Sequence, residues 1–326
     1  MQTQTLAATR DGFGRAMVAV GHKHPEAVVL SADLSESLKL QEFRREFPSR
    51  YIECGVAEQN MMSVAAGLAL AGKMPFVASF AAFNPGLNLA QLRVALYSGL
   101  NLKVIGGHAG LNVGEDGATH QILEDLAIVS ALPDIAIAVP ADAAQAEKLT
   151  LAIARHHGPA YLRLGRSKLI ALAELVPELP PTKFGQAQLL RQGGDLSIFA
   201  CGLMVQAALR AAAQLAPLGI SAEVINLHTL RPLDEAAIVA SVAKTGAAIA
   251  ACEHQLDSGF NSLIMSSIHR AMGKQLQRPI AYEAVGTTGF GESGPDAQVL
   301  HKYGIDEVGL IKKVKLLLAK KNKLNS

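Results

Sequence analysis

The sequence predicts an α/β fold arranged as two tandem domains. Short apolar runs of strand length alternate with longer amphipathic stretches along most of the chain, which is the pattern of βαβ units. A segment rich in proline and glycine interrupts the alternation near the middle, and 326 residues suffice for about two domains. We therefore expect domains at 1–168 and 193–326, joined by a linker at 169–192.

In the first half, four apolar runs have the length of buried strands. They lie at 27–30, 75–78, 102–105 and 135–139. The longer stretches around them are expected to form helices at 10–20, 59–71, 87–97 and 143–156. Apolar runs without polar alternation are typical of strands buried on both faces, so a parallel sheet covered by helices is expected here.

The second half resumes the alternation after the segment that contains Pro177, Pro180 and Pro181. Strands are expected at 196–200, 222–225, 247–252 and 280–282, and helices at 205–216, 235–243 and 260–272. No sequence repeat relates the two halves, so the prediction is two α/β domains in tandem.

Composition narrows the classes of function. Half of the residues are hydrophobic and 18% are charged, which fits a filled core and excludes a disordered chain. A net charge of +2 favours neither nucleic acid nor an anionic membrane as a partner. Three widely spaced cysteines suggest a reducing compartment, and neither a signal-peptide pattern nor an apolar run of about 20 residues is present. We expect a soluble cytoplasmic protein.

Functional groups of open α/β sheets gather in the loops beyond the carboxyl ends of the strands. Polar loops of this kind lie at 31–37, 79–86, 106–121 and 163–166. The third contains five glycines within twelve residues, and two histidines and two acids lie in the same loop, which suits close approach of the backbone to a ligand. The separation of His108 and His120 fits none of the short ligand spacings typical of zinc, so no metal site is expected in this chain.

Glu58 is the most informative single residue. It begins a predicted helix whose continuation is almost wholly apolar, and a buried carboxylate is tolerated only when it is paired or hydrogen-bonded. Either the carboxylate serves the helix N-terminus, a favourable interaction of roughly 0.3–1 kcal/mol, or it binds a ligand.

Three segments of the first half, Gly55–Met61, His108–Gln121 and Tyr161–Arg166, resemble the transketolase family in order and spacing. Asn226–Asp234 and Gly291–Pro295 are similar to its C-terminal domain. The resemblance covers essentially the whole chain and implies a pyrimidine-binding domain of thiamine-diphosphate enzymes, with a parallel sheet, followed by a transketolase C-terminal domain. Full-length transketolases are about twice this size, so the chain resembles the C-terminal section, or small subunit, of a split enzyme.

The resemblance implies roles for individual residues. Glu58 would bind the aminopyrimidine ring nitrogen of thiamine diphosphate and activate the cofactor, and Phe80 and Phe83 would pack on that ring. His120 would join Glu58 as a catalytic residue, since histidine exchanges protons near neutral pH. The residues that match ligands of the sugar or its phosphate are Arg10, Ser37, His108, Asp116, His120 and Arg166.

Two further residues belong to the same loops. Arg163 is expected either to share the phosphate or to pair with a nearby acid, and Asp33 is expected to shape the site.

Part of the cofactor site is missing from the sequence. Thiamine-diphosphate enzymes hold the diphosphate through Mg²⁺ bound by a Gly-Asp-Gly motif, and no such triplet occurs here. The resemblance therefore implies an N-terminal partner subunit that binds the diphosphate and Mg²⁺, in an α2β2 assembly. Such a pair would transfer a two-carbon ketol unit from a ketose phosphate to an aldose phosphate, a pentose-phosphate type of reaction.

Two alternatives remain. One is the β subunit of a 2-oxo-acid dehydrogenase, which has a similar length and domain order, although a 2-oxo acid needs no array of phosphate ligands. The other is a non-catalytic, transketolase-like regulatory partner. The sequence does not identify the sugar phosphates.

Overall fold

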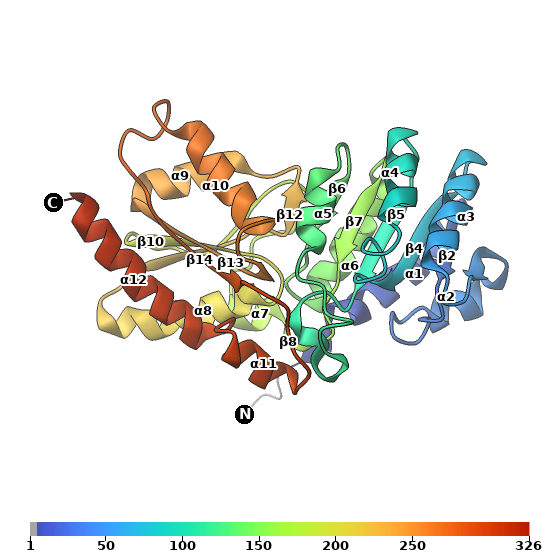
Figure 1. The fold of residues 1–326 in the computed structure, drawn as a ribbon, viewed down its shortest axis with the longest axis horizontal. Coiled ribbons are helices and arrows are strands. Elements are labelled where there is room, and N and C mark those ends of the chain that lie inside the picture. Colours follow the sequence, from blue (N-terminus) through green and yellow to red (C-terminus); the bar gives the residue numbers. More distant parts are fainter. Residues whose placement is uncertain (1–4, 326) are drawn as a thin grey trace.

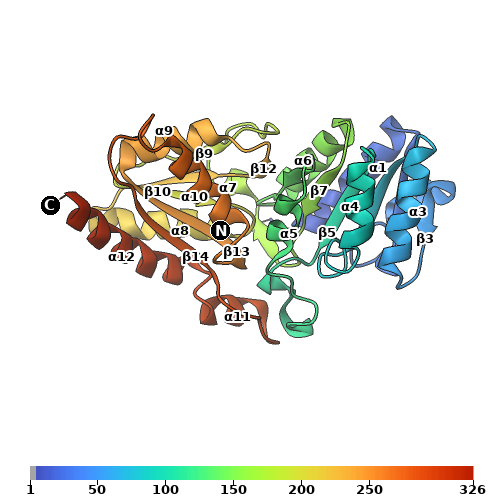
Figure 2. The ribbon, with the colours of Figure 1, turned by 45° about the horizontal axis from the view of Figure 1, so that its top comes forward.

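The structure, a computed structural model, describes residues 5–325 and consists of two α/β domains that lie side by side (Figure 1). The first domain is coloured blue to green, and the second yellow to red. The view turned by 45° shows the same arrangement, with the C-terminal helix on the outer side of the second domain (Figure 2). The α/β architecture predicted from the alternation of apolar segments is confirmed.

The first domain is built on a seven-stranded sheet with the order β12-β6-β7-β5-β4-β2-β3. Six of these strands are parallel, and β12 pairs antiparallel with β6 at one edge. The central strands are buried along their whole length, as expected for a parallel sheet covered on both faces. The strands are β2 (Ala27–Ser31), β3 (Tyr51–Glu53), β4 (Met74–Phe80), β5 (Lys103–Gly107), β6 (Ala136–Ala138), β7 (Ala160–Arg163) and β12 (Thr229–Arg231).

Helices cover both faces of this sheet. On one face, apolar residues of α1, α2 and α6 pack on the strands, and on the other face those of α3, α4 and α5 do so. The elements are α1 (Thr9–Lys23), α2 (Gln41–Glu46), η1 (Pro48–Arg50), α3 (Glu58–Leu70), α4 (Leu89–Tyr97), η2 (Leu111–Asp116), α5 (Asp125–Ala131) and α6 (Ala143–Arg155), where η is a 3-10 helix.

The second domain has a five-stranded sheet with the order β14-β13-β10-β11-β9, in which only β9 is antiparallel to its neighbour. Helices α8 and α12 cover one face, and α9 and α10 cover the other. The elements are β9 (Gln188–Arg191), β10 (Leu196–Ala200), α8 (Met204–Leu215), η3 (Ala216–Leu218), β11 (Ala222–Asn226), α9 (Glu235–Thr245), β13 (Ala247–Gln255), α10 (Phe260–Ala271), β14 (Ala281–Thr287), α11 (Asp296–Lys302) and α12 (Glu307–Asn325).

The two domains are interlocked by short elements that the hydrophobic pattern does not indicate. The segment 169–192 carries α7 (Leu172–Leu175) and β9, and β8 (Lys168–Ile170) pairs with β1 (Leu6–Ala8). Further along the chain, β12 leaves the second domain to join the first sheet. Runs of three or four residues are too short to show a period in sequence.

Within residues 5–325, no helix combines the length and the apolar character needed to cross a bilayer.

Candidate functional site

Three of the predicted site residues lie at or near the carboxyl ends of strands of the first sheet, the edge at which functional groups of open α/β sheets gather. Glu58 begins α3, Phe80 ends β4, and His108 follows β5. The backbone at His108 has φ +54°, a left-handed conformation that non-glycine residues seldom adopt and that often marks functional positions.

Glu58 is 4% exposed, and its only side-chain contact in the described chain is with a neutral group. The hydroxyl of Ser79, a residue that is itself fully buried, donates to Oε1 of Glu58 at 3.0 Å. No cation of residues 5–325 forms an ion pair with this carboxylate. Its position at the first turn of α3 gives it the favourable field of the helix N-terminus, and Oε2 remains available to a ligand.

Two buried asparagines fix the loop beside Glu58. Asn84 donates from Nδ2 to the carbonyls of Val77 and Ile105, at 2.8 and 3.1 Å, and so joins the loop to β4 and β5. Asn88 donates to the Asn84 side-chain oxygen at 3.0 Å and to the Glu58 carbonyl at 3.4 Å. Glu58 is therefore held by neutral polar groups on an ordered support.

Four aromatic rings form a cluster at the end of β4. Phe80 lies 4.0 Å from the ring of His108, measured between centroids, and is stacked on Phe83 at 6.4 Å. His120 meets both phenylalanines edge-on, at 6.2 and 5.6 Å. Because Phe80 directly follows Ser79, the last two residues of β4 connect the Glu58 carboxylate with the two histidines.

Arg10 connects His108 with the loop after β2. Its Nη1 donates to Nε2 of His108 and to the Ser37 carbonyl, both at 3.0 Å. Ser37 thus contributes its backbone oxygen to this contact, and its hydroxyl has no partner in the described chain. The buried Nε of Arg10 has no protein acceptor.

His108 is neutral near pH 7. Burial, together with the charges of Arg10, Arg166 and Lys39 and the neighbouring His120, lowers the pKa of its imidazole to about 3. Since Nε2 accepts from Arg10, the proton of the neutral ring is on Nδ1, and this buried donor has no partner in the described chain. His108 and Arg10 therefore offer two unused N–H groups, Nδ1–H and Nε–H, which suit an anion.

Arg166 lies at the same end of the site. The Arg166 guanidinium donates from Nη1 to the Val113 carbonyl and, at 2.8 Å, to the exposed carboxylate of Glu115. Its charge also acts on Arg10, whose pKa is lowered first by burial and then by Arg166. In the described chain, neither guanidinium has a buried acid as an ion-pair partner.

The remaining predicted residues differ in placement. Asp116, at the end of η2, is exposed, and within residues 5–325 its carboxylate contacts none of the other candidate residues. Asp33, predicted to shape the site, is also exposed and has φ +59°. Lys39 was not predicted; it has φ +61°, and its charge acts on His108.

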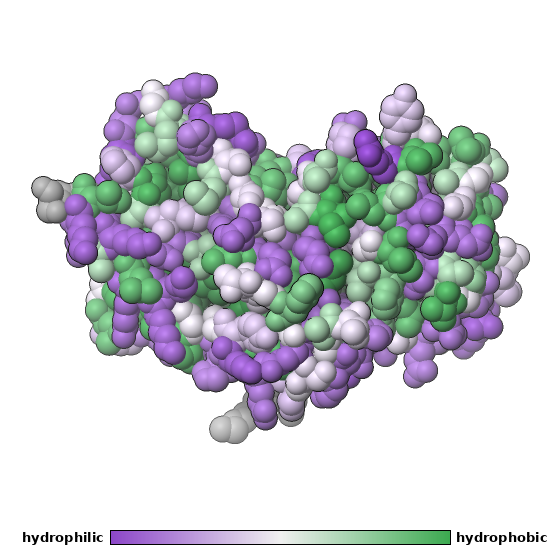
Figure 3. All heavy atoms as spheres, in the orientation of Figure 1, coloured by the Kyte–Doolittle hydropathy of each residue, from purple (hydrophilic) through white to green (hydrophobic). Residues whose placement is uncertain are grey.

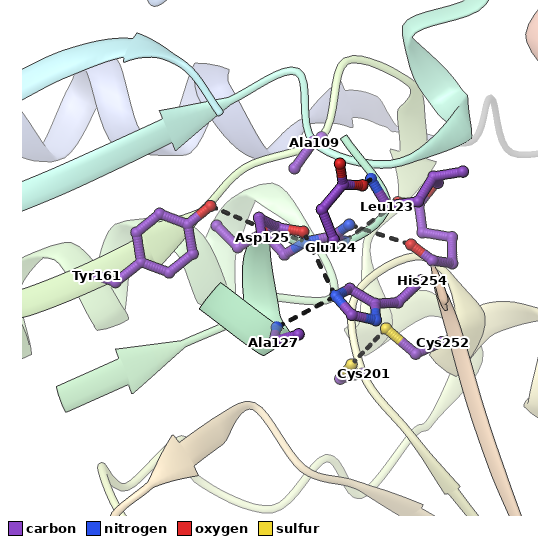
Figure 4. Close-up of polar contacts among 12 residues, drawn as sticks. Ala109, Leu123, Glu124, Asp125, Ala127, Tyr161, Cys201, Cys252 and His254 are labelled. Atoms are coloured by element: carbon purple, nitrogen blue, oxygen red, sulfur yellow. Dashed lines mark hydrogen bonds and ion pairs between the residues drawn. The ribbon is translucent and has the colours of Figure 1, made fainter. Parts of the chain in front are cut away.

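Arg163 pairs with acids, which is one of the two roles that the sequence left open. It is 4% exposed, donates from Nε to Asp125 at 2.8 Å and forms an ion pair with Glu253 at 3.5 Å. Figure 4 shows the surroundings of Asp125, where Tyr161 donates to the carboxylate at 2.8 Å and His254 lies beside Ala127. The buried charges therefore lie where the two domains meet.

Two contacts in this region were not anticipated from sequence. The free thiols of Cys201, which directly follows β10, and Cys252, on the neighbouring β13, lie 3.3 Å apart (Figure 4). Ser79 was visible in a polar loop, but nothing in the sequence assigned it to Glu58. In the part of the chain that the structure describes, no cluster of three or more histidines, cysteines or acids could hold a metal ion.

Comparison with known protein families gives two matches that together span most of the chain. Residues 6–170 match the model of the transketolase pyrimidine-binding domain. Residues 185–310 match the model of the transketolase C-terminal domain.

Individual proteins similar to this chain include two whose names state a substrate. One is a 6-deoxy-6-sulfo-D-fructose transketolase subunit of Clostridium sp. (strain MSTE9), 35% identical over 315 residues that cover 96% of this chain and 95% of the relative. Another is one of the subunits of an apulose-4-phosphate transketolase from Phocaeicola vulgatus, 31% identical over 318 residues, with coverage of 94% and 96%. A solved structure described as a split gene transketolase, inactive beta4 tetramer, superposes with a TM-score of 0.85 at 37% identity and covers 96% of this chain and 99% of its own.

Proposed function

Because this chain belongs to the transketolase family and corresponds to its C-terminal section, we propose that it is the C-terminal subunit of a split, thiamine-diphosphate-dependent transketolase. Paired with an N-terminal subunit, it transfers a two-carbon ketol unit from a ketose phosphate to an aldose phosphate. One pair of observations supports this most directly: the buried carboxylate of Glu58 has no cation partner in the described chain, and Arg10 and His108 keep buried N–H groups without acceptors.

The chain's residues fit one half of a thiamine diphosphate site. The carboxylate of Glu58 has a free oxygen where a ring N–H would donate, and Phe80 and Phe83 offer faces to a flat heterocycle. Aromatic contacts of this kind are worth about 0.5–1.5 kcal/mol beyond the buried area, so they orient the ring as well as bind it. The diphosphate and its Mg²⁺ are assigned to the partner subunit, because the sequence has no Gly-Asp-Gly motif.

When bound, the cofactor supplies the electron sink that carbon–carbon cleavage requires. The carboxylate of Glu58 would form a hydrogen bond with the aminopyrimidine ring nitrogen. His120, whose Nδ1 lies 3.0 Å from the Thr119 hydroxyl, exchanges a proton with the sugar hydroxyl or carbonyl. Arg10, Arg166 and the Nδ1–H of His108 bind the phosphate, while Ser37 and Asp116 contribute to the sugar-binding loops.

The N-terminal partner fits the outer surface of α3 and α4. Leu70, Val94 and Tyr97 are 74%, 66% and 94% exposed on these two helices. Hydrophobic side chains are visible on this end of the molecule at the right of Figure 3. Apolar surface of this kind on two neighbouring helices is typical of a subunit interface, and we assign it to an α2β2 assembly in which the cofactor lies between subunits.

The 2-oxo-acid dehydrogenase alternative makes no use of the cations around His108. A planar 2-oxo acid carries one carboxylate, whereas this site offers Arg10, Arg166 and the unpartnered Nδ1–H of His108. A non-catalytic role is disfavoured by the presence of both the Glu58 support and the unused donors, since neither stabilises the fold without a ligand.

The test is reconstitution. The chain is combined with its N-terminal partner, thiamine diphosphate, Mg²⁺ and xylulose 5-phosphate with an aldose phosphate acceptor, and the transferred product is measured. We expect turnover by the pair and none by the isolated chain. Decarboxylation of a 2-oxo acid by the pair would favour the dehydrogenase, and absence of all turnover by a folded pair would support the regulatory role. The two relatives act, by their names, on a sulfo sugar and on apulose 4-phosphate, so both belong in the substrate panel.

A further inference from the structure

The loop that carries η2 lies between Arg166 of the first domain and helix α11 of the second domain, and it contacts both. Helix α11 lies beside this loop in both ribbon views (Figures 1 and 2). Ser167 donates to Asp296 of α11 at 2.6 Å, and Gln121 donates to the Glu292 carbonyl at 3.1 Å. The loop's conformation is therefore set by groups from both domains.

Glu253, at the end of β13 in the second domain, makes the deepest of these contacts. Its Oε1 accepts from Nδ2 of Asn112 at 2.6 Å, and its Oε2 accepts from the Asn112 backbone N–H at 3.3 Å. Both side chains are buried, with exposures of 3% and 1%. Hydrogen bonds to a buried carboxylate are among the stronger polar contacts in proteins, so Asn112 has one defined orientation.

The other end of the Asn112 amide holds Arg166. Oδ1 accepts from the Arg166 backbone N–H at 2.6 Å and from the Ser167 backbone N–H at 3.2 Å. The next residue, Val113, accepts from the Arg166 guanidinium. Both the main chain and the side chain of Arg166 are therefore bound to two consecutive residues of η2.

The backbone is shaped to allow this approach. Gly110 has φ +90°, and a Cβ at this position would lie 2.3 Å from Cδ of Glu253. Only glycine fits there, both for its conformation and for its lack of a side chain. At Gly165, a Cβ would lie 3.2 Å from Nδ2 of Asn112, so the backbone approaches closely on both sides of the contact.

We propose that Glu253 and Asn112 are positioning residues: through them, the second domain fixes the direction in which Arg166 presents its guanidinium to the anionic end of the substrate. This inference rests on the proposed function and deepens it, because it gives the second domain a part in substrate binding. Neither residue touches the substrate. Their effect reaches it through the Arg166 backbone, and a displacement of about 1 Å in a binding group is costly.

The test separates binding of the phosphate from the chemistry. With the reconstituted pair, kcat and KM are measured for an aldose phosphate and for glycolaldehyde, which has no phosphate. For Asn112→Ala and Glu253→Gln we expect the KM for the aldose phosphate to rise about tenfold, while both constants for glycolaldehyde change less than about twofold. Tyr161→Phe is the matched control: it removes a buried hydrogen bond to Asp125 of the same interdomain region but no contact of Asn112.

A double variant that exchanges the acid and the amide between positions 112 and 253 controls for single variants that lose activity because they misfold. Asn112→Asp retains an acceptor for the Arg166 N–H but places a carboxylate against Glu253, and we expect it to raise the KM for the aldose phosphate. Adding Glu253→Gln supplies an amide that donates to the new carboxylate, so the double variant is expected to restore KM to within about threefold of the native value. The proposal would be overturned if the folded double variant did not restore KM, or if the single variants left KM unchanged. It would also be overturned if the single variants lost activity equally with the aldose phosphate and with glycolaldehyde.

A second measurement does not depend on turnover. The isolated full chain is titrated with inorganic phosphate by calorimetry, and Arg166→Ala reports the loss of the anion site. Weaker binding in Asn112→Ala and Glu253→Gln, with native binding in Tyr161→Phe, is expected. If the reconstituted pair were inactive, the proposed function would fail while this titration still tested the positioning of Arg166; native phosphate affinity in both variants would overturn the positioning role alone.

Discussion

The two ends of the candidate site are supported in opposite ways. Glu58 is a buried carboxylate held by neutral groups, Ser79 and the asparagines behind it, and no protein cation in the described chain balances its charge. At the other end, the charges of Arg10 and Arg166 act on a neutral His108, and the acid that pairs with Arg166, Glu115, is exposed. Each end therefore lacks the charge that its ligand would bring. The difference indicates that the two ends of the site suit chemically different groups: a hydrogen-bond donor at Glu58 and an anion at Arg10 and Arg166.

The largest effect is expected at the carboxylate end. Glu58→Gln retains the shape and the Ser79 contact but removes the charge, and kcat at saturating cofactor should fall by at least about 100-fold. The fold should survive, because a buried unpaired charge is removed. The matched control is Glu235→Gln, which alters the first-turn glutamate of α9 and should leave kcat unchanged. Equal activities of the two variants would return Glu58 to a helix-terminus role.

The cationic end is expected to respond in substrate binding. Arg10→Ala should raise the KM for an aldose phosphate about 10- to 100-fold, because it removes a charged donor and leaves Nε2 of His108 without a partner. Arg15→Ala is the control, since Arg15 lies on the same helix but pairs with Glu147 at the surface. Steady-state kinetics with and without phosphate on the acceptor check this, and a similar KM in both variants would argue against a phosphate site.

The buried carboxyl of Glu253, which accepts from Asn112 of η2, predicts a pH dependence of stability. Burial raises the pKa of the Glu253 carboxyl to about 7, and Arg163 and Asn112 oppose the rise. The folded state then binds this proton more tightly than the unfolded state, so the contribution is complete below about pH 4.3 and is lost as the pH rises through about 7.

Relative to Glu253→Gln, the free energy of unfolding of the native chain should therefore fall by at most about 1.4 kcal/mol per pH unit between about pH 5 and 7. Urea unfolding at a series of pH values measures this difference. Glu36→Gln, in an exposed loop, should follow the native chain in parallel. A difference between native and Glu253→Gln that is constant with pH would exclude titration of Glu253 in this range.

The smallest effect is expected at the neutral support of Glu58. Ser79→Ala removes one hydrogen bond of 3.0 Å to Oε1 and should lower kcat by about three- to tenfold, consistent with a net contribution near 1 kcal/mol. Ser79→Thr keeps the hydroxyl and is the conservative control. If Ser79→Ala were fully active, the orientation of Glu58 would have to come from α3 and the bound ligand alone.

Local sequence was sufficient for the alternating elements and for the residues that stand in recognisable loops. Glu58 was found because one carboxylate precedes an apolar helix, and His108 because it lies in a glycine-rich loop after a strand. The contact between Asn112 and Glu253 joins residues 141 positions apart, and no local pattern encodes such a pair. Ser79 looked like any serine at a strand end, and only the fold shows the carboxylate that it contacts.

The strand β12 has a consequence for how such chains can be recombined. It comes from the second half yet completes the edge of the first sheet against β6, and Arg231 donates to the Ser130 carbonyl at 2.6 Å. A break at the 169–192 segment would thus separate the first domain from one of its own strands and leave the β6 edge open to other chains. An exchange of C-terminal halves between relatives must therefore match at residues 229–231 as well as at the junction. The two domains are best exchanged together, because β12 of the second half is a strand of the first sheet.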